Sequence, residues 1–299
     1  MERTLAVPHK AGMKFAEALG VVWYHMDNHH RRIALDNLEI AFGDRLSETE
    51  REALCKKNFQ HLARVVLEIP YLHTLTADNL DQFVSFAGVQ HLEAALNKGK
   101  GLLVMASHFG NWELTSLAVS LKYHPFNVVV RPLDNSLLNR MIDRMRTRTG
   151  NRMIAKKDSL RQVLRRLRNA EAVALLIDQN AKRSEGVFVP FFNKVASTNK
   201  ALAVLALRTR APVLPAFNIR RPDGRYLVFF EPEVPLTVTG DTMQDIARNT
   251  ASFNRIIEKN IRLFPDQWLW LHHRWRTRPQ QSVHEDPIIS ETATGSSQR

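Results

Sequence analysis

One stretch decides the fold of this chain: Gly101-Leu-Leu-Val-Met-Ala-Ser-His-Phe-Gly-Asn-Trp-Glu113. An apolar run with strand character ends in small residues, and a histidine, a glycine and an asparagine then lead into a helical pattern. This layout places His108 on a strand-to-helix loop and Glu113 in the first turn of the helix. Because α/β proteins form their sites on loops at the carboxyl ends of strands, we expect a functional site here.

The chemistry of such a pair follows from the two ring nitrogens of histidine. A carboxylate that hydrogen-bonds one nitrogen fixes the tautomer and leaves the other nitrogen free as a general base. Glu113 can bind His108 in this way, and such a pair can remove the proton from a hydroxyl that attacks an acyl group. The alternative is a His108 that only caps or packs at the loop. A second pair with the same spacing, His73 and Asp78, lacks the preceding strand and the glycine, and we interpret it as a surface turn.

Outward from this stretch, strand and helix patterns alternate. We predict strands at Leu102–Ala106, Asn127–Val130, Arg152–Ala155, Ala172–Ile177, Val213–Ile219 and Tyr226–Phe230. Helical patterns cover Trp112–Lys122, Asn135–Arg148, Asp158–Asn169 with Asp158 as its cap, Thr198–Arg210 and Thr242–Phe264. The turn at 222–225 marks a hairpin between the last two strands. Alternation of this kind predicts an α/β fold with a mostly parallel central sheet flanked by helices.

The regions on either side of this pattern differ from it. Residues 1–84 form an N-terminal helical segment, in which 1–45 give one or two helices that end at Phe42. Ser47 and Glu50 form a capping box that opens a helix running to about Ile69, where Pro70 stops it. Residues 85–278 form the α/β domain. The tail 279–299 is rich in Ser, Thr and Gln, and we expect it to be disordered.

Two further polar positions follow predicted strands. Arg131 ends one strand, and Asp178 with Gln179 ends another. If these strands run parallel to the strand before His108, all of these side chains emerge at one edge of the sheet. A guanidinium there can hold a phosphate or a developing oxyanion. Taken singly, Asp178 reads as a cap and Arg131 as a surface ion pair.

Two aromatic segments remain open to more than one interpretation. The segment 186–193, with three Phe, either lines an acyl-chain slot or is an edge strand packed in the core. The segment Trp268-Leu-Trp-Leu-His-His-Arg-Trp-Arg276 mixes indoles and cations, a pattern typical of a membrane interface and also of stacking on RNA.

Composition narrows the class of protein. The net charge of +12 favours an anionic partner, and 11 Arg or Lys lie between Arg140 and Arg168, either as a docking surface or as a solvated one. The single Cys55 excludes an internal disulfide, and the spacing of the histidines gives no metal site. No apolar run is long enough to span a bilayer, but Ala11 to Met26 reads as either an interfacial amphipathic helix or a core helix.

Five blocks in order resemble the bacterial lipid A biosynthesis acyltransferases, the lauroyl/myristoyl family of the wider H-x4-D/E class. They are His-Phe-Gly-Asn-Trp-Glu at 108–113, Arg131-Pro, Asp178-Gln179, Gly-Val-Phe-Val-Pro-Phe-Phe at 186–192, and the closing 268–276 block. The stretch 31–42 is also similar to the family. The likeness covers roughly residues 20 to 278.

The resemblance implies an acyl thioester donor, usually acyl carrier protein or else acyl-CoA, and a lipid-sugar acceptor. It implies His108 as general base and Glu113 as its orienting partner, with Arg131, Asn111, Asp178 and Gln179 in substrate binding. No cofactor or metal is expected. It also implies a peripheral location on the cytoplasmic face of the cell inner membrane, within lipopolysaccharide biosynthesis.

Two departures from the family leave alternatives open. Members commonly begin with a membrane-spanning helix, which this chain lacks at sufficient length, and His-His-Arg stands at 272–274 where His-Arg-Arg is expected. The acceptor could be another lysolipid. Thioesterase activity and a non-enzymatic protein that binds RNA or anionic membrane are the other candidates, although no nucleic-acid partner is expected.

Overall fold

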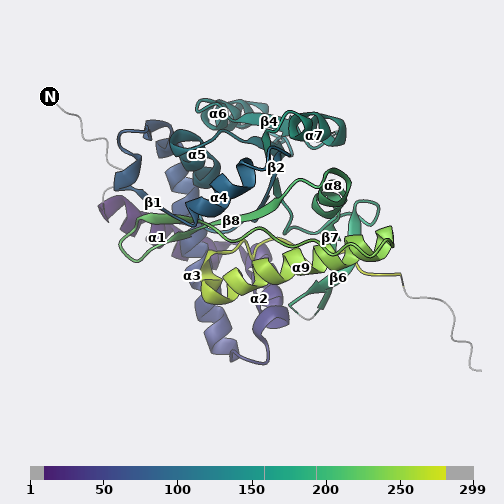
Figure 1. The fold of residues 1–299 in the computed structure, drawn as a ribbon. Coiled ribbons are helices and arrows are strands. Elements are labelled where there is room, and N and C mark those ends of the chain that lie inside the picture. The colour runs from purple at the N-terminus through teal and green to yellow at the C-terminus, as the bar shows by residue number, and fades with distance from the viewer. Residues whose placement is uncertain (1–9, 158, 193, 281–299) are drawn as a thin grey trace, which may run out of the picture.

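The computed structural model describes residues 10–157, 159–192 and 194–280. Asp158, the predicted helix cap, lies outside the described residues, as does most of the predicted disordered tail. The observed fold is α/β, as predicted, with a central sheet between two layers of helices (Figure 1).

Three helices open the chain: α1 (Lys10–Met26), α2 (Asn28–Phe42) and α3 (Glu48–Glu68). The side chain of Asp27 caps α2 by accepting from the backbone of His30 at 3.0 Å. The predicted capping box is present at the start of α3, where the Ser47 backbone donates to Glu50 at 2.8 Å. The α-helix ends at Glu68, just before Pro70, and the chain continues through the short 3₁₀ helices η1 (Ile69–Thr74) and η2 (Leu80–Gln82).

The main sheet has the strand order β1-β9-β8-β2-β5-β3-β4. Its strands are β1 (Val84–Ala87), β2 (Leu102–Ala106), β3 (Asn127–Val130), β4 (Arg152–Ala155), β5 (Ala172–Leu176), β8 (Val213–Arg220) and β9 (Tyr226–Phe230). β8, β2, β5, β3 and β4 pair in parallel, while β8 and β9 form the predicted antiparallel hairpin. The mostly parallel sheet is therefore confirmed, and β1, which pairs with β9, is an additional edge strand.

Alternation along β2 assigns the helices to the two faces of the sheet. Leu102 and Val104 enter one buried cluster with side chains of α4 (Val89–Leu96), α5 (Trp112–Lys122) and α6 (Ser136–Thr147). Leu103 and Met105 enter the other cluster with α2, α3 and the remaining helices. Those remaining helices are α7 (Ser159–Arg168), α8 (Ala201–Thr209) and α9 (Thr242–Leu263). In Figure 1, α4, α5 and α6 lie above β8 and α9 lies below it with α2 and α3.

The aromatic segment after β5 is a hairpin, not a loop. β6 (Gly186–Phe191) pairs antiparallel with β7 (Lys194–Asn199). Phe191 is fully buried and Phe192 is 2% exposed, so the core-packing interpretation holds for these two rings. The helix predicted from Thr198 begins only at Ala201, because Ser197 and Thr198 pair with Phe188 and Val187 in this hairpin.

The segment after α9, with η3 (Pro265–Gln267), is held by amides of the opening helices. Asn37 of α2 donates to the carbonyl oxygens of Trp270 and His272, both at 2.7 Å. Asn58 of α3 donates to the carbonyl oxygens of Asp266 at 2.8 Å and Trp268 at 2.6 Å. Residues far apart in sequence are thus joined at the same end of the molecule. Within the described residues, no helix combines the length and the apolar character that crossing a membrane requires.

Candidate active site

His108 lies beside Asp178 because β2 and β5 are paired in parallel. Ala106 is in register with Leu176, so the residues two positions further along both strands become neighbours. The Nδ1 atom of His108 lies 2.9 Å from Oδ1 of Asp178, and the His108 backbone donates to Oδ2 at 2.8 Å. The predicted convergence of His108 and Asp178 at one sheet edge is thus observed.

Asp178 is enclosed, with an exposed fraction of 1%. The indole Nε1 of Trp268 donates to its Oδ2 at 2.7 Å, from the segment that Asn58 holds. Burial by itself would raise the pKa of Asp178, but attraction to His108 and the hydrogen bonds from His108 and Trp268 hold that pKa below its usual value. An ionised Asp178 accepts a hydrogen bond from the protonated Nδ1 of His108. The lone pair of the neutral ring is then on Nε2.

The Nε2 atom of His108 lies beside Gln179, in a side chain that is not fully buried. The side chain is 20% exposed, and the Nε2 amide nitrogen of Gln179 lies 3.3 Å from the ring nitrogen. The ring of Trp112 stands edge-on at 5.2 Å between centroids. This arrangement can orient a general base and let a hydroxyl group approach it.

Glu113 is placed differently from our prediction. Its two carboxylate oxygens are bound by Arg146 of α6, with Nε to Oε2 at 2.8 Å and Nη2 to Oε1 at 2.6 Å. Asp178 occupies the Nδ1 position of His108 that Glu113 was expected to take. The predicted hydrogen bond is replaced because strand register brings Asp178 directly to the imidazole, while a bidentate guanidinium satisfies both oxygens of Glu113.

Arg146 was not singled out by sequence reasoning. Burial opposes its charge, but the hydrogen bonds and attraction of Glu113 raise its pKa above the ordinary value. In the sequence it is one of 11 cations between Arg140 and Arg168, which hides it. The available signal was its position next to Met145 and four residues after Ile142, the two buried side chains of α6.

The other predicted substrate-binding residues divide between surface and interior. Arg131 follows β3 at the same sheet edge, but its side chain is 80% exposed and its ion pair with Asp134 is 3.6 Å long. Asn111 is fully buried and caps α5, with Oδ1 accepting from the Leu114 backbone at 3.1 Å. Its side chain is therefore turned into the protein.

The closing aromatic and cationic block is mostly interior, which argues against its reading as a membrane or RNA surface. Trp268 is 1% exposed, Trp270 is fully buried and Trp275 is 7% exposed. Arg274 is fully buried and donates to the Ser197 carbonyl at 3.0 Å. Burial lowers the pKa of Arg274 to about 10, so the guanidinium stays charged at neutral pH.

His272 lies beside the site and is neutral. Burial lowers its pKa to about 4, and its Nε2 accepts from the backbone of Asn180 at 3.0 Å. The exposed His73, by contrast, hydrogen-bonds the neighbouring Pro70 carbonyl in η1, which agrees with its interpretation as a surface turn.

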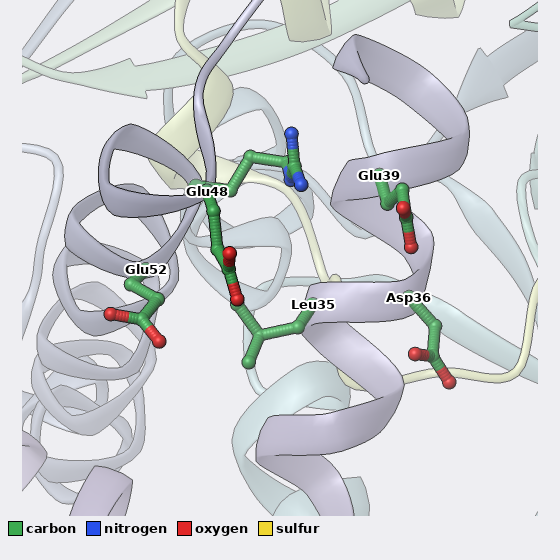
Figure 2. A pocket seen from close by; sticks show the side chains of 6 residues that line it. Leu35, Asp36, Glu39, Glu48 and Glu52 are labelled. Atoms are coloured by element: carbon green, nitrogen blue, oxygen red, sulfur yellow. The ribbon is translucent and has the colours of Figure 1, made fainter.

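A concave feature lies between α2 and α3 (Figure 2). Asp36 and Glu39 of α2 and Glu48 and Glu52 of α3 line it, together with Leu35 and Arg51. This acidic groove contains none of the predicted site residues. Across the described residues, no cluster of three or more His, Cys, Asp or Glu is arranged to hold a metal ion.

Comparison with known proteins assigns the family. The family sequence model of the bacterial lipid A biosynthesis acyltransferases matches residues 2–277 of this chain. A lipid A biosynthesis acyltransferase of Haemophilus influenzae is 29% identical over 93% of this chain and 88% of its own length. From Escherichia coli, a lipid A biosynthesis palmitoleoyltransferase is 31% identical over 83% of this chain and 79% of its length. An Escherichia coli lipid A biosynthesis lauroyltransferase is 27% identical over 92% and 88%.

The family match covers the loop of His108, the Asp178 strand end and the Trp268 segment together. The site geometry and the similarity therefore concern the same residues, and the chain is an acyltransferase. It belongs to the bacterial lipid A biosynthesis acyltransferase family.

Proposed function

We propose that this acyltransferase moves a fatty acyl chain from a carrier-protein thioester to a hydroxyl of a lipid A precursor, with His108 as the general base. The observation that carries the proposal is the imidazole held at Nδ1 by the buried Asp178, with Nε2 3.3 Å from the Gln179 amide and the side chain 20% exposed. The names of the relatives, which include a palmitoleoyltransferase and a lauroyltransferase of lipid A biosynthesis, support the acceptor class.

In the proposed reaction, the acceptor hydroxyl gives its proton to Nε2 of His108 while its oxygen attacks the thioester carbonyl. The tetrahedral oxyanion then collapses, the carbon–sulfur bond breaks, and the leaving thiolate takes the proton from the imidazolium. Asp178 stabilises that imidazolium and keeps its orientation. No covalent acyl-enzyme is required, so mixing the protein with donor alone leaves it unacylated.

Arg146 replaces Arg131 as the proposed cation of the site. Its guanidinium is fixed by two hydrogen bonds to Glu113 at the end of the His108 loop, whereas Arg131 is 80% exposed. A preorganised cation stabilises developing negative charge better than a mobile one, because little reorganisation is needed when the charge forms. Glu113 in this proposal orients Arg146, and Asp178 orients His108.

The decisive experiment supplies purified protein with labelled acyl-carrier-protein or acyl-CoA and a lipid A precursor, and follows the label by mass spectrometry. Label in the lipid, lost in His108→Ala and retained in the control His73→Ala, supports the proposal. Label only in free fatty acid assigns a thioesterase instead. Label in another lysolipid of a total extract, with none in the precursor, replaces the acceptor.

The donor is proposed to dock on α7. Arg161, Arg165 and Arg168 lie on one exposed face of this helix, at spacings of four and three residues. Other cations of the Arg140–Arg168 run are already engaged: Arg146 with Glu113, Arg152 with Glu171 and Lys156 with Glu185. Acyl carrier proteins are strongly acidic, so a basic face whose three cations form no ion pair among the described residues suits them.

The membrane contact is proposed to be α1, on the cytoplasmic face of the cell inner membrane. Phe15, Leu19, Val22 and Met26 recur at helical spacing with exposed fractions of 60%, 38%, 50% and 78%. The opposite side of α1 packs on α3, where Trp23 meets Phe59 edge-on at 5.1 Å. A helix with one apolar face in solvent, in a chain whose net charge is +12, suits an anionic lipid surface.

A further inference from the structure

Five buried polar side chains form a cluster behind the loop that carries His108 and Glu113. They come from α3, the loop itself, β8 and β9, and are Glu68, Asn111, Asn218, Arg220 and Tyr226. None is more than 8% exposed. Polar groups at such depth cost free energy unless they are paired, so their hydrogen bonds indicate what the cluster holds in place.

The carboxylate of Glu68 is the centre of this cluster. Its Oε2 atom accepts from Asn111 Nδ2 at 3.0 Å and from the Tyr226 hydroxyl at 2.6 Å, and it forms an ion pair with Arg220 Nη2 at 2.6 Å. Three donors on one oxygen, one of them charged, offset part of the cost of burying this carboxylate, whose Oε1 atom has no hydrogen-bond partner among the described residues. Glu68 belongs to α3, so the N-terminal helices reach the back of the active-site loop.

Asn111 is the member that belongs to the loop, three residues after His108 and two before Glu113. Its Oδ1 caps α5, and its Nδ2 is taken by Glu68. Its backbone N–H donates to Asn218 Oδ1 at 2.8 Å, and its carbonyl accepts from Asn218 Nδ2. Both the backbone and the side chain of this one residue are therefore fixed by the cluster.

Gly110 shows how closely the loop is pressed against the cluster. Its φ of +61° lies in the left-handed region, and a Cβ added there would stand 1.9 Å from Asn218 Oδ1. Its carbonyl accepts from His61 Nε2 at 3.2 Å, and its N–H donates to the Gln267 carbonyl at 2.9 Å. Because the loop is packed this tightly, we expect Asn111 to move only together with its neighbours in the loop. A shift of Asn111 would therefore also move His108 and Glu113.

We infer that Glu68 is a positioning residue of the acyl transfer: through Asn111 it fixes the relative placement of His108 and Glu113, with Arg220 and Tyr226 holding its carboxylate. Glu68 touches no reactant. A buried ion pair is no more stable than apolar packing of the same volume, so stability alone does not account for it. Directional hydrogen bonds, by contrast, fix one arrangement.

The inference rests on the proposed base His108, and the test compares Tyr226→Phe and Glu68→Gln with Asp245→Asn. Asp245 is a matched control because it is 3% exposed and accepts from Thr239 at the start of α9, outside the cluster. We expect kcat to fall about tenfold or more in the two cluster variants with KM for the donor unchanged, because a misplacement of about 1 Å costs that much in rate. We expect Asp245→Asn to lower Tm and leave kcat as in wild type.

A second readout does not depend on turnover. The imidazole signals of His108 in NMR spectra, assigned by their loss in His108→Ala, should shift in the cluster variants and stay in place in Asp245→Asn. If the wild-type protein showed no acyl transfer, the proposed function would be wrong. The NMR signals would still test whether Glu68 positions His108. If Tyr226→Phe lowered Tm but kept both kcat and the His108 signals of wild type, Glu68 would be a structural residue only.

Discussion

At the scale of single residues, the site depends on the carboxylate of Asp178, which the register of β2 and β5 places beside His108. Asp178 is enclosed by Trp268 and the His108 backbone, and its lowered pKa keeps it ionised beside the imidazole. We expect the pair to act as one unit, because the Nδ1 atom of His108 is committed to Asp178.

We expect His108→Ala to reduce kcat about 10²–10⁴-fold, the usual effect of removing a general base. Asp178→Asn should also be severe, because an amide cannot stabilise the imidazolium. The double variant should be hardly worse than His108→Ala, since the two side chains act together. Steady-state rates at saturating donor measure this, and multiplicative losses in the double variant would contradict the pairing.

The Glu113–Arg146 ion pair leads to a separate prediction. We expect Glu113→Ala and Arg146→Ala to lower activity by similar factors and their combination to add little, because each removes the same bidentate pair. Combined with His108→Ala, either change should show a further loss in any residual rate. Single-turnover assays can follow this cycle. A double variant as poor as the product of its two single losses would separate Glu113 from Arg146.

Residue-level sequence reasoning predicted the convergence of His108 and Asp178, but it expected Glu113 to bind His108, whereas its carboxylate binds Arg146. A spacing of five residues shows that a carboxylate begins the next helix, and it does not show which side chain arrives from another element. Arg146 reaches Glu113 from α6 through tertiary packing, over a sequence separation of 33. The cluster around Glu68 was missed for the same reason, since Tyr226 lies 158 residues away.

At the scale of elements, strongly patterned segments were predicted well. The apolar run Leu102–Ala106 is β2 with the same bounds, and the turn chemistry at 222–225 correctly joined two strands. Weakly patterned ones were not: β1 has only four residues, and its pairing with β9 depends on a hairpin more than 130 residues later in the sequence. Tertiary pairing with β6 also converted Thr198 from the predicted helix to strand.

The basic face of α7 gives an element-scale prediction. Changing Arg161, Arg165 and Arg168 to Glu should raise KM for acyl-carrier-protein and leave kcat with a short uncharged thioester nearly unchanged. The effect should lie in the association rate and fade as salt rises, because exposed charges act over about 10 Å at 0.1 M ionic strength.

The control reverses three exposed cations of α9, Arg248, Arg255 and Lys259, and so changes the net charge equally. If both triple variants raised KM alike, the donor would respond to net charge and α7 would lose its special role. Unaltered carrier kinetics at low salt together with lost liposome binding would assign α7 to the membrane.

The apolar stripe of α1 gives a second prediction at this scale. Replacing Phe15, Leu19, Val22 and Met26 by Ser should weaken binding to anionic vesicles at least about tenfold, since even partial burial of four apolar side chains exceeds about 1.4 kcal/mol. Vesicle sedimentation measures the binding. Val238→Ser with Met243→Ser, at sites 48% and 69% exposed elsewhere, is the control, and equal loss in both proteins would remove α1 as the contact.

At the scale of the whole molecule, acid should destabilise the fold through its buried neutral histidines. Burial lowers the pKa of His61 to about 3 and that of His272 to about 4, from 6.5. Below pH 6.5 the unfolded chain binds protons that the folded chain does not, so the stability present above that pH is lost progressively as pH falls toward those values. Each group contributes up to about 1.4 kcal/mol per pH unit.

The measurement is the free energy of unfolding by denaturant at pH 7, 6, 5 and 4.5. His61→Gln should flatten the dependence by about one proton, because an amide keeps a donor for the Gly110 carbonyl without titrating. His73→Gln, at an exposed position, should leave the slope as in wild type. A wild-type stability that stays level from pH 6.5 to 5 would contradict the buried, neutral state of both histidines.

The hydrogen bond from Trp268 to Asp178 has a consequence for the order of events during synthesis. Ribosomes deliver the chain from its amino end, so β2, β5 and the loop of His108 emerge well before Trp268, which comes 90 residues after Asp178. Until then Asp178 lacks its indole donor, and Asn37 and Asn58 lack the carbonyls that they will bind. A nascent chain thus carries the proposed base His108 before Trp268 binds Asp178, and we expect activity to begin only when the last segment packs against α2 and α3.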